Sequence, residues 1–226
     1  MYKKSIIIIS LIVLMMFFIS CSADFTYDFE NNNIKFDYGV ANVPVDYEKK
    51  GYSIIVKQTE IPNLNSSGLM MSGYNMGDNM FLYCYVNIGK VLKLDKNKKY
   101  EGTLYFDVAT MMQKSVGNIT DKIPAQSVII KAGIMPEKPE VSENDGMYKP
   151  NFLIGHYMTD EKYIKALGNI AKVNYKSGTD FEYKTFDTNL KASTDKDGNL
   201  YLIIGIDSYY IGPSWVFLDN IKLKIN

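Results

Sequence analysis

The chain has 226 residues, 46% of them hydrophobic, and equal numbers of basic and acidic side chains, so its formal net charge is zero. Apart from one histidine, every basic residue is lysine, and the sequence contains no arginine. A neutral chain without arginine lacks the basic surface and the forked guanidinium groups that nucleic-acid-binding proteins commonly use. No nucleic-acid partner is therefore expected.

Residues 1–20 have the layout of an export signal. Lys3 and Lys4 form a basic start, and an apolar run follows over residues 6–18. The run is too short to span a bilayer comfortably, which favours a cleaved signal. The closing Phe18-Ile-Ser-Cys21 resembles the bacterial lipobox, with phenylalanine in place of the usual leucine. The resemblance implies cleavage before Cys21, diacylation of its sulfur, and a lipid-anchored, extracytoplasmic protein of the bacterial cell envelope.

Beyond a short tether at residues 21–24, residues 25–226 are predicted to form a single domain with a substantial core. Because Cys21 carries lipid in this interpretation, Cys84 has no partner. A disulfide framework and a cysteine metal site are then excluded within the monomer. Cys84 is in phase with Leu82 and Val86, which predicts a buried, inert thiol.

Strand patterns dominate the rest of the chain. Apolar and polar residues alternate over residues 100–108, which is the period of a half-buried strand. Further strands are expected at residues 52–61, 80–88, 127–133, 181–190, 200–206 and 215–225. One short helix is expected near residues 160–167. The pattern predicts an all-β fold, a two-sheet antiparallel β-sandwich of the jelly-roll type with at most one short helix.

The two ends of this region carry a resemblance. Phe25-Thr-Tyr-Asp-Phe-Glu30 opens it, and Trp215-Val-Phe-Leu-Asp-Asn-Ile-Lys-Leu-Lys-Ile225 closes it. Both resemble the corresponding ends of the galactose-binding-like jelly roll found in carbohydrate-binding modules. The resemblance implies glycan binding and a structural calcium held by Glu30 and Asp219 together with backbone carbonyls, since hard oxygen ligands suit calcium.

Asp219 is unusual on physical grounds as well. Its parity in the last strand is that of Trp215, Phe217 and Ile221, so a regular strand would place a carboxylate on an apolar face. An unpaired buried carboxylate is costly. We therefore expect a cation, hydrogen bonds from backbone N–H groups, or a β-bulge that moves the residue.

Three internal stretches resemble small uncharacterised bacterial lipoproteins, and this likeness brings no known activity. They are Ser72-Gly-Tyr-Asn75 followed by Asp78, then Lys131-Ala-Gly133, and finally Gly205-Ile-Asp-Ser208.

The candidate ligand contacts are Tyr74, Asn75, Asp78 and Asn79, in a polar, turn-rich loop. Aromatic rings beside amide and carboxyl groups suit sugars, because the rings stack on C–H faces while the polar groups bind hydroxyls. The alternative is that most aromatic side chains fill the core, as they do in most small domains.

Catalysis has little support in the sequence. His156 is the only histidine, which excludes a histidine-rich metal site. Glu101, Asp107 and Asp207 are expected to face outward as ordinary surface charges. The leading hypothesis is a non-catalytic, membrane-anchored protein that binds a glycan or another extracellular ligand. The alternative is a structural or adhesive protein-interaction module of the envelope, and a glycan-active enzyme ranks third.

Overall fold

The computed structural model describes residues 23–31, 33–77, 79–113, 124–172 and 180–226. The predicted export signal, Cys21 and Asp78 lie outside these residues. Within them, no helix is both long enough and apolar enough to cross a membrane. The elements in chain order are β1 (Ala23–Tyr27), β2 (Asp37–Ala41), β3 (Val43–Pro44), β4 (Ile54–Ile61), β5 (Ser66–Asn75), β6 (Met80–Asn87), α2 (Ile88–Val91), β7 (Lys99–Thr110), a 3₁₀ turn (Pro124–Gln126), β8 (Val128–Met135), β9 (Val141–Asn144), β10 (Met147–Pro150), β11 (Ile164–Asn169), β12 (Glu182–Ser193), β13 (Tyr201–Ser208) and β14 (Gly212–Ile225).

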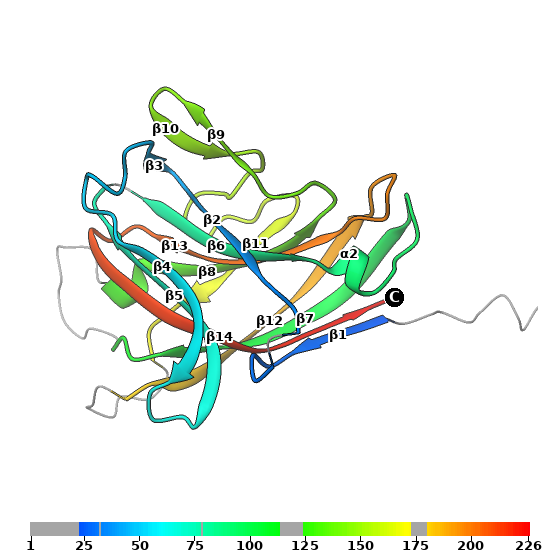
Figure 1. Cartoon of the computed structure of the whole chain (residues 1–226), viewed down its shortest axis with the longest axis horizontal. Helices are drawn as coiled ribbons and strands as arrows, with labels where there is room; N and C mark the ends of the chain where they lie inside the picture. Colours follow the sequence, from blue (N-terminus) through cyan, green and yellow to red (C-terminus); the bar gives the residue numbers. More distant parts are fainter. Residues whose placement is uncertain (1–22, 32, 78, 114–123, 173–179) are drawn as a thin grey trace, which may run out of the picture.

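The long strands form two antiparallel sheets that pack face to face (Figure 1). Sheet A has the order β12-β7-β14-β5-β4, with β1 also paired to β14, and sheet B has the order β11-β8-β13-β6-β2. From β5 to β8, and again from β11 to β14, each strand lies in the opposite sheet from the one before it. This alternation is that of a jelly roll, so the predicted β-sandwich is confirmed.

The core lies between the two sheets and is made of the side chains that the alternating pattern points inward. Leu104, Phe106 and Val108 of β7 are buried there, as the sequence pattern predicts. On β6 the inward positions are aliphatic, and Cys84 between them is a fully buried free thiol, which confirms its predicted place. Burial raises the pKa of this thiol to about 12, so it stays protonated and unreactive at neutral pH.

A second apolar layer covers the outer face of sheet B. Residues 152–163, which we call the strap, lie across this face after the small sheet β3-β10-β9. The ring of Phe152 lies edge-on to Tyr83, with centroids 5.6 Å apart. Gly133 of β8 allows the close approach, because a Cβ atom there would lie 1.8 Å from the carbonyl oxygen of Tyr163. The aromatic row on the outer face of β6, made of Phe81, Tyr83 and Tyr85, is therefore buried under the strap.

The helix predicted over residues 160–167 is wrong. Part of that segment is strand β11, whose Ile164 pairs with Gly133 of β8, with a register shift between Ala166 and Gly168. A helix of two turns is marginal by itself, so pairing with an existing sheet edge overrides the local pattern. The short helix that the structure does contain, α2, begins at Ile88 and is capped by Asn87, whose side chain accepts a hydrogen bond from the backbone N–H of Lys90.

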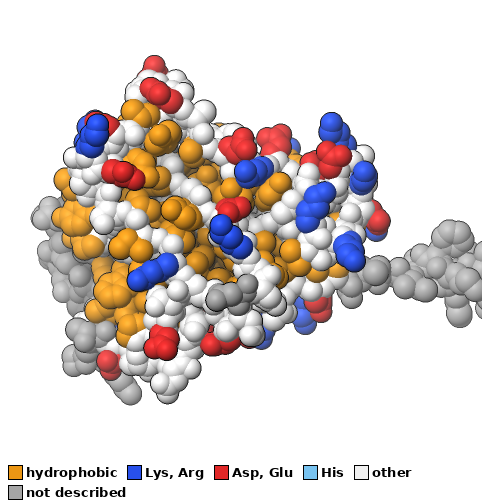
Figure 2. All heavy atoms as spheres, viewed as in Figure 1, with side chains coloured by type: hydrophobic (Ala, Val, Ile, Leu, Met, Phe, Trp, Pro, Cys, Tyr) orange, Lys and Arg blue, Asp and Glu red, His pale blue; other side chains and the backbone are white. Residues whose placement is uncertain are grey.

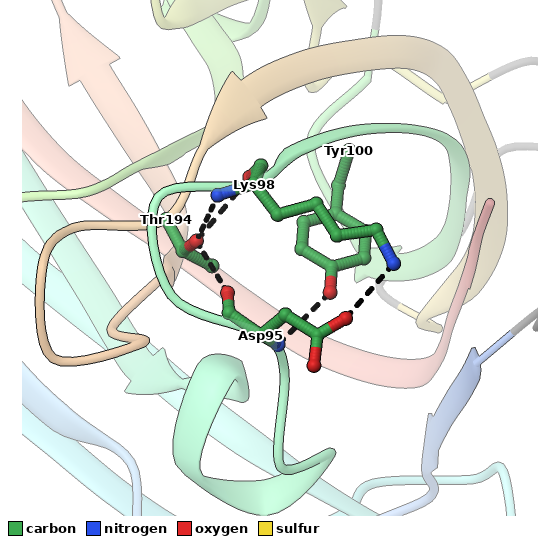
Figure 3. A network of polar contacts seen from close by, with 4 residues as sticks. All are labelled: Asp95, Lys98, Tyr100 and Thr194. Atoms are coloured by element: carbon green, nitrogen blue, oxygen red, sulfur yellow. Dashed lines mark hydrogen bonds and ion pairs between the residues drawn. The ribbon is translucent and has the colours of Figure 1, made fainter.

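A buried threonine joins two turns at one end of the sandwich (Figure 3). The hydroxyl of Thr194, which follows β12, donates to the carbonyl of Asp95 at 2.6 Å and accepts from the backbone N–H of Lys98 at 3.0 Å. The Lys98 ammonium pairs with the Asp95 carboxylate at 2.9 Å, and the Tyr100 hydroxyl accepts from the Asp95 N–H at 3.0 Å. These contacts hold the loop that leads from α2 into β7.

Candidate functional site

The sandwich is open at one edge, where β4 ends sheet A and β2 ends sheet B. Phe29 and Phe36 fill part of the opening, with ring centroids 5.3 Å apart. Two adjacent hollows remain, of about 610 Å³ and about 360 Å³, and together we call them the edge groove. Figure 2 shows hydrophobic side chains gathered on this face of the molecule, with lysine side chains among them. The larger hollow is lined by Phe29, Ile34, Lys35, Phe36, Asp37, Tyr38, Val56, Lys57, Gln58, Leu69, Tyr85 and Lys138, and the smaller by Tyr38, Tyr47, Glu48, Gly51, Tyr52, Ser53 and Ile54.

Tyr38 lines both hollows of the edge groove. Its register partner on β6 is Cys84, so it has the parity of the core-facing residues. Its side chain is nevertheless 56% exposed, because β2 is an edge strand and the sandwich is open beside it. An aromatic ring of core-facing parity that remains in solvent is a surface on which a ligand can stack.

Polar groups flank this ring on both sides. The amide nitrogen of Gln58 donates to the carbonyl oxygen of Phe29, which fixes the amide at the opening. Asp37 and Lys57 line the larger hollow, and Ser53 lines the smaller one. A groove that combines aromatic rings with amide, carboxyl, ammonium and hydroxyl groups has the chemistry needed for a polyhydroxylated ligand.

The predicted contact residues of the loop near residue 74 are only partly accessible. Tyr74 lies on the outer face of sheet A and is 41% exposed. Its backbone N–H donates to the carbonyl of Ser53, a lining residue of the smaller hollow, at 3.1 Å, but Tyr74 itself does not line that hollow. Asn75 is fully buried, and its amide donates to the carbonyls of Ser208 and Tyr210 at 2.9 Å and 3.1 Å. That amide therefore holds the turn before β14 and is not available to a ligand at the surface.

The other two predicted ligand contacts, Asp78 and Asn79, are not tested by the structure. Asn79 is half-buried, and Asp78 lies outside the described residues. Ligand binding by Tyr74 and Asn79 stays a prediction.

The two predicted calcium ligands do lie together. Glu30 accepts hydrogen bonds from the Ser67 N–H at 2.8 Å and from the Ser66 hydroxyl at 3.0 Å. The same Ser66 hydroxyl lies 3.0 Å from an oxygen of Asp219. One hydroxyl proton thus lies between two carboxylates, and it can serve only one of them at a time.

Asp219 sits at a β-bulge, one of the outcomes that its sequence parity predicted. The register of β14 against β7 shifts between Asp219 and Lys222, and Asn220 has a left-handed backbone with φ of 51°. The carboxylate accepts from the Asn220 N–H at 2.7 Å and from the Tyr183 hydroxyl. Burial raises the pKa of Asp219, these hydrogen bonds lower it, and the nearby charge of Glu30 raises it further.

The donor set fits part of a calcium site. Glu30 and Asp219 are hard oxygen donors whose mutual repulsion a cation would relieve. The strained left-handed backbone of the buried Phe29, with φ of 58°, turns Glu30 toward this position. In the part of the chain that the structure describes, no group of three or more acidic, histidine or cysteine residues is placed to hold a metal ion. Backbone and hydroxyl oxygens would have to complete the shell.

The three acids considered for catalysis are all engaged. Glu101 is paired with Lys99 at 2.8 Å. Asp107 accepts hydrogen bonds from Thr185 and Asn220. The expectation that Asp207 is a surface charge is wrong, because it is fully buried beneath the strap and paired with Lys131 at 2.9 Å.

The sequence interpretation missed Tyr38. The alternation of Phe36, Tyr38 and Val40 indicates a short strand, but a two-residue period says only which side chains share a face. The exposure of Tyr38 follows from the position of β2 at the edge of its sheet, which depends on the pairing of strands far apart in the sequence.

The chain matches no known protein family and no curated protein. Its strand arrangement is similar to that of solved carbohydrate-binding modules. One is the family 11 module of Clostridium thermocellum in complex with a β-1,3-1,4-mixed-linked tetrasaccharide, at 13% identity and a TM-score of 0.44, over 90% of this chain and 96% of that one. A module of the β-sandwich superfamily described as promiscuous in specificity is 12% identical, with a TM-score of 0.41. That similarity spans 86% of this chain and 59% of the other.

A cleaved adhesin domain of Lys-gingipain from Porphyromonas gingivalis is also similar, at 13% identity and a TM-score of 0.36, over 88% of this chain and 96% of that domain. Similarity at these levels does not assign a ligand to this chain.

Proposed function

We propose that this protein is a lipid-anchored, extracytoplasmic protein of the bacterial cell envelope that binds a glycan in the edge groove and does not catalyse a reaction. The observation that carries the proposal is Tyr38, a half-exposed ring of core-facing parity that lines both hollows of the groove. A ring held on a strand offers a stacking surface at a low cost in conformational entropy, and the surrounding polar groups can bind hydroxyls.

The proposed lipid anchor favours the edge groove over another, larger hollow of the surface. That hollow, of about 1030 Å³, lies on the outer face of sheet A, where Tyr105 is its aromatic residue and Asp24 of β1 lies at its border. With the chain tethered at Cys21, three residues before Asp24, this hollow would lie near the membrane. Figure 1 shows the start of β1 and the C-terminus together at one end of the sandwich and β3, β9 and β10 toward the other.

The proposal of a non-catalytic protein rests on the partners of the acidic residues. Glycoside hydrolysis needs two carboxylates that face each other across a pocket. Glu101, Asp107 and Asp207 each have a hydrogen-bond or ion-pair partner, and Asp207 is inaccessible. What these side chains do in the described structure is hold strands and the strap together.

We also propose that Glu30 and Asp219 hold a structural calcium ion. The ion would supply the positive charge between two carboxylates that now share a single hydroxyl proton. It would fasten the segment before β2 to β5 and β14, and it would take no part in a reaction.

The glycan proposal is tested with a glycan array and isothermal titration on the purified full-length protein. We expect the wild type to bind at least one glycan. Tyr38→Ala should weaken that binding by about fivefold or more, since removal of a stacking ring costs about 1–3 kcal/mol by analogy with nucleic-acid bases stacked on aromatic side chains.

Two variants serve as matched controls. Leu153→Ser changes another exposed side chain, on the strap, and should leave the affinity unchanged. Tyr74→Ala tests the loop predicted from the sequence. Loss of binding in Tyr74→Ala with none in Tyr38→Ala would move the site to that loop, and the absence of any bound glycan would refute the proposed function.

A second candidate is a protein-interaction module. Leu153 is 70% exposed beside a small hollow of about 210 Å³ that is lined mainly by apolar groups, including those of Phe152 and Tyr163. An exposed leucine that adjoins an apolar hollow lined by aromatic rings forms a hydrophobic surface patch, and such patches can mark sites of protein interaction. This candidate is favoured if no glycan on the array binds and Leu153→Ser abolishes binding of the protein to cell-envelope proteins.

A further inference from the structure

The charges around the larger hollow of the edge groove are unbalanced. Lys35, Lys57 and Lys138 line it, against one acidic lining residue, Asp37. Lys138 lies 3.8 Å from Glu140 and is thus partly compensated. Of the other two lysines, neither ammonium group has an ion-pair partner among the described residues. Because Asp37 is the acidic residue that lines the hollow, the hollow keeps an excess of one positive charge.

The two lysines that form no ion pair, Lys35 and Lys57, belong to different elements. Lys35 precedes β2, and Lys57 lies on the edge strand β4. Both side chains are exposed, and Tyr38 stands at the same opening. A ligand that stacks on the ring of Tyr38 would therefore share the hollow with two lysines from different elements.

We propose that the ligand of the edge groove is an acidic polysaccharide, one whose sugar units carry carboxylate or sulfate groups. This inference rests on the proposed glycan-binding function of the same groove. Charge-assisted hydrogen bonds from lysine to an anionic group are about twice as strong as neutral ones. Lysine acts as a flexible point charge, which suits repeated anionic groups whose exact register along a chain varies.

The alternative is a neutral glycan that pairs its hydroxyls with Asp37 and Gln58 and leaves the lysines in water. The two possibilities differ in their salt dependence. An exposed ion pair is screened as the ionic strength rises, whereas stacking and neutral hydrogen bonds change little.

The experiment uses an array of paired polysaccharides on the full-length protein. Each pair shares one backbone, for example polygalacturonate with its fully methyl-esterified form, or a sulfated glycan with its desulfated form. We expect the acidic member of at least one pair to bind tenfold or more tightly than its neutral partner, and this preference to fall as sodium chloride rises from 50 to 300 mM. Lys35→Gln and Lys57→Gln should each reduce the preference.

Lys191→Gln is the matched control, since it removes an exposed lysine from the hollow on the outer face of sheet A. If the neutral members bind as tightly as the acidic ones, or if Lys191→Gln matches the groove variants, the acidic-ligand inference is overturned and the glycan-binding function stands. If no glycan binds at all, the proposed function and the inference both fail.

Discussion

At the scale of single residues, Lys131 and Asp207 form a fully buried ion pair beneath the strap. Both side chains are fully buried on the outer face of sheet B, 2.9 Å apart. The Lys131 ammonium also donates to the carbonyls of Ile154 and Gly155, at 3.1 Å and 2.7 Å. The carboxylate accepts from the hydroxyl of Tyr209 at 2.8 Å, and its second oxygen has no partner among the described residues.

Removal of the ammonium should therefore be costly. We expect Lys131→Met to reduce the free energy of unfolding by about 3–5 kcal/mol, because it leaves a buried carboxylate without its partner. The double variant Lys131→Met/Asp207→Leu should recover most of the loss, since an apolar pair has no charge to desolvate. Urea denaturation of the two variants and the wild type measures both effects, and a double variant as unstable as the single one would contradict this account.

The same variant should depend on pH in a defined direction. Burial raises the pKa of Asp207 above its ordinary value, and the charge of Lys131 opposes the rise. Without Lys131 the folded-state pKa rises further, so the folded protein binds more protons than the unfolded chain. Its stability then increases as the pH falls toward the ordinary value of an aspartate. Denaturation at pH 7 and pH 5 should show a smaller penalty for Lys131→Met at pH 5.

Glu30 provides the test of calcium binding. We expect millimolar calcium to raise the melting temperature of the full-length protein and chelation to lower it, because an ion that binds only the folded state stabilises that state. Glu30→Gln should remove this response, while the exposed control Glu143→Gln should keep it. If calcium leaves the melting temperature of the wild type unchanged, the calcium proposal is wrong.

At the scale of elements, two of the internal stretches singled out in the sequence lie side by side under the strap. Lys131-Ala-Gly133 lies on β8 and Gly205-Ile-Asp-Ser208 on the neighbouring β13, where Lys131 pairs with Gly205. A Cβ atom at Gly205 would lie 2.6 Å from the ring of Phe81, so glycine there makes room for that ring. The glycines admit the strap and the aromatic row, and the charged pair fastens the strap. This combination explains why these residues occur together.

The turn network of Figure 3 gives a second prediction at this scale. Thr194→Val keeps the shape of the buried side chain but removes the hydroxyl that serves Asp95 and Lys98. We expect a loss of about 1–3 kcal/mol in unfolding free energy, because two part-buried hydrogen bonds are lost and each contributes about 0.5–1.5 kcal/mol. Thr194→Ser should retain most of the stability, and an equal loss in both variants would point to packing in place of hydrogen bonding.

At the scale of the whole molecule, the strand content and the two-sheet architecture could be predicted from alternation alone. The alternation of apolar and polar residues over residues 100–108 predicts the correct buried face of β7. It does so because a strand in a sandwich turns every second side chain toward the core between the sheets. The segment at residues 160–167 could not be assigned in this way, since its strand conformation depends on the edge of β8. The same limit applies to Asp207, whose burial depends on a strap some fifty residues away in the sequence.

The candidate site was predictable in part. Glu30 and Asp219 could be brought together from the two ends of the chain, and the structure places both beside Ser66. The stacking residue could not be found, because alternation puts Tyr38 among the core residues and only its place at an open edge exposes it. Asn75 is the opposite case. The sequence predicts a residue that is accessible to a ligand, but its side chain is buried at the end of β5 and donates to two backbone carbonyls.

The pairing of β1 with β14 has a mechanical consequence. Ala23 lies opposite Ile225, so the strand that follows the proposed lipid anchor is stitched to the last strand over five residues. If the protein is anchored and binds its ligand as proposed, a pull on a ligand in the edge groove would reach the membrane through β1. Tension along the strand axis must shear its hydrogen bonds together, whereas tension across it can peel them one by one from Ala23. The bond between cell and ligand should therefore resist some pulling directions much better than others.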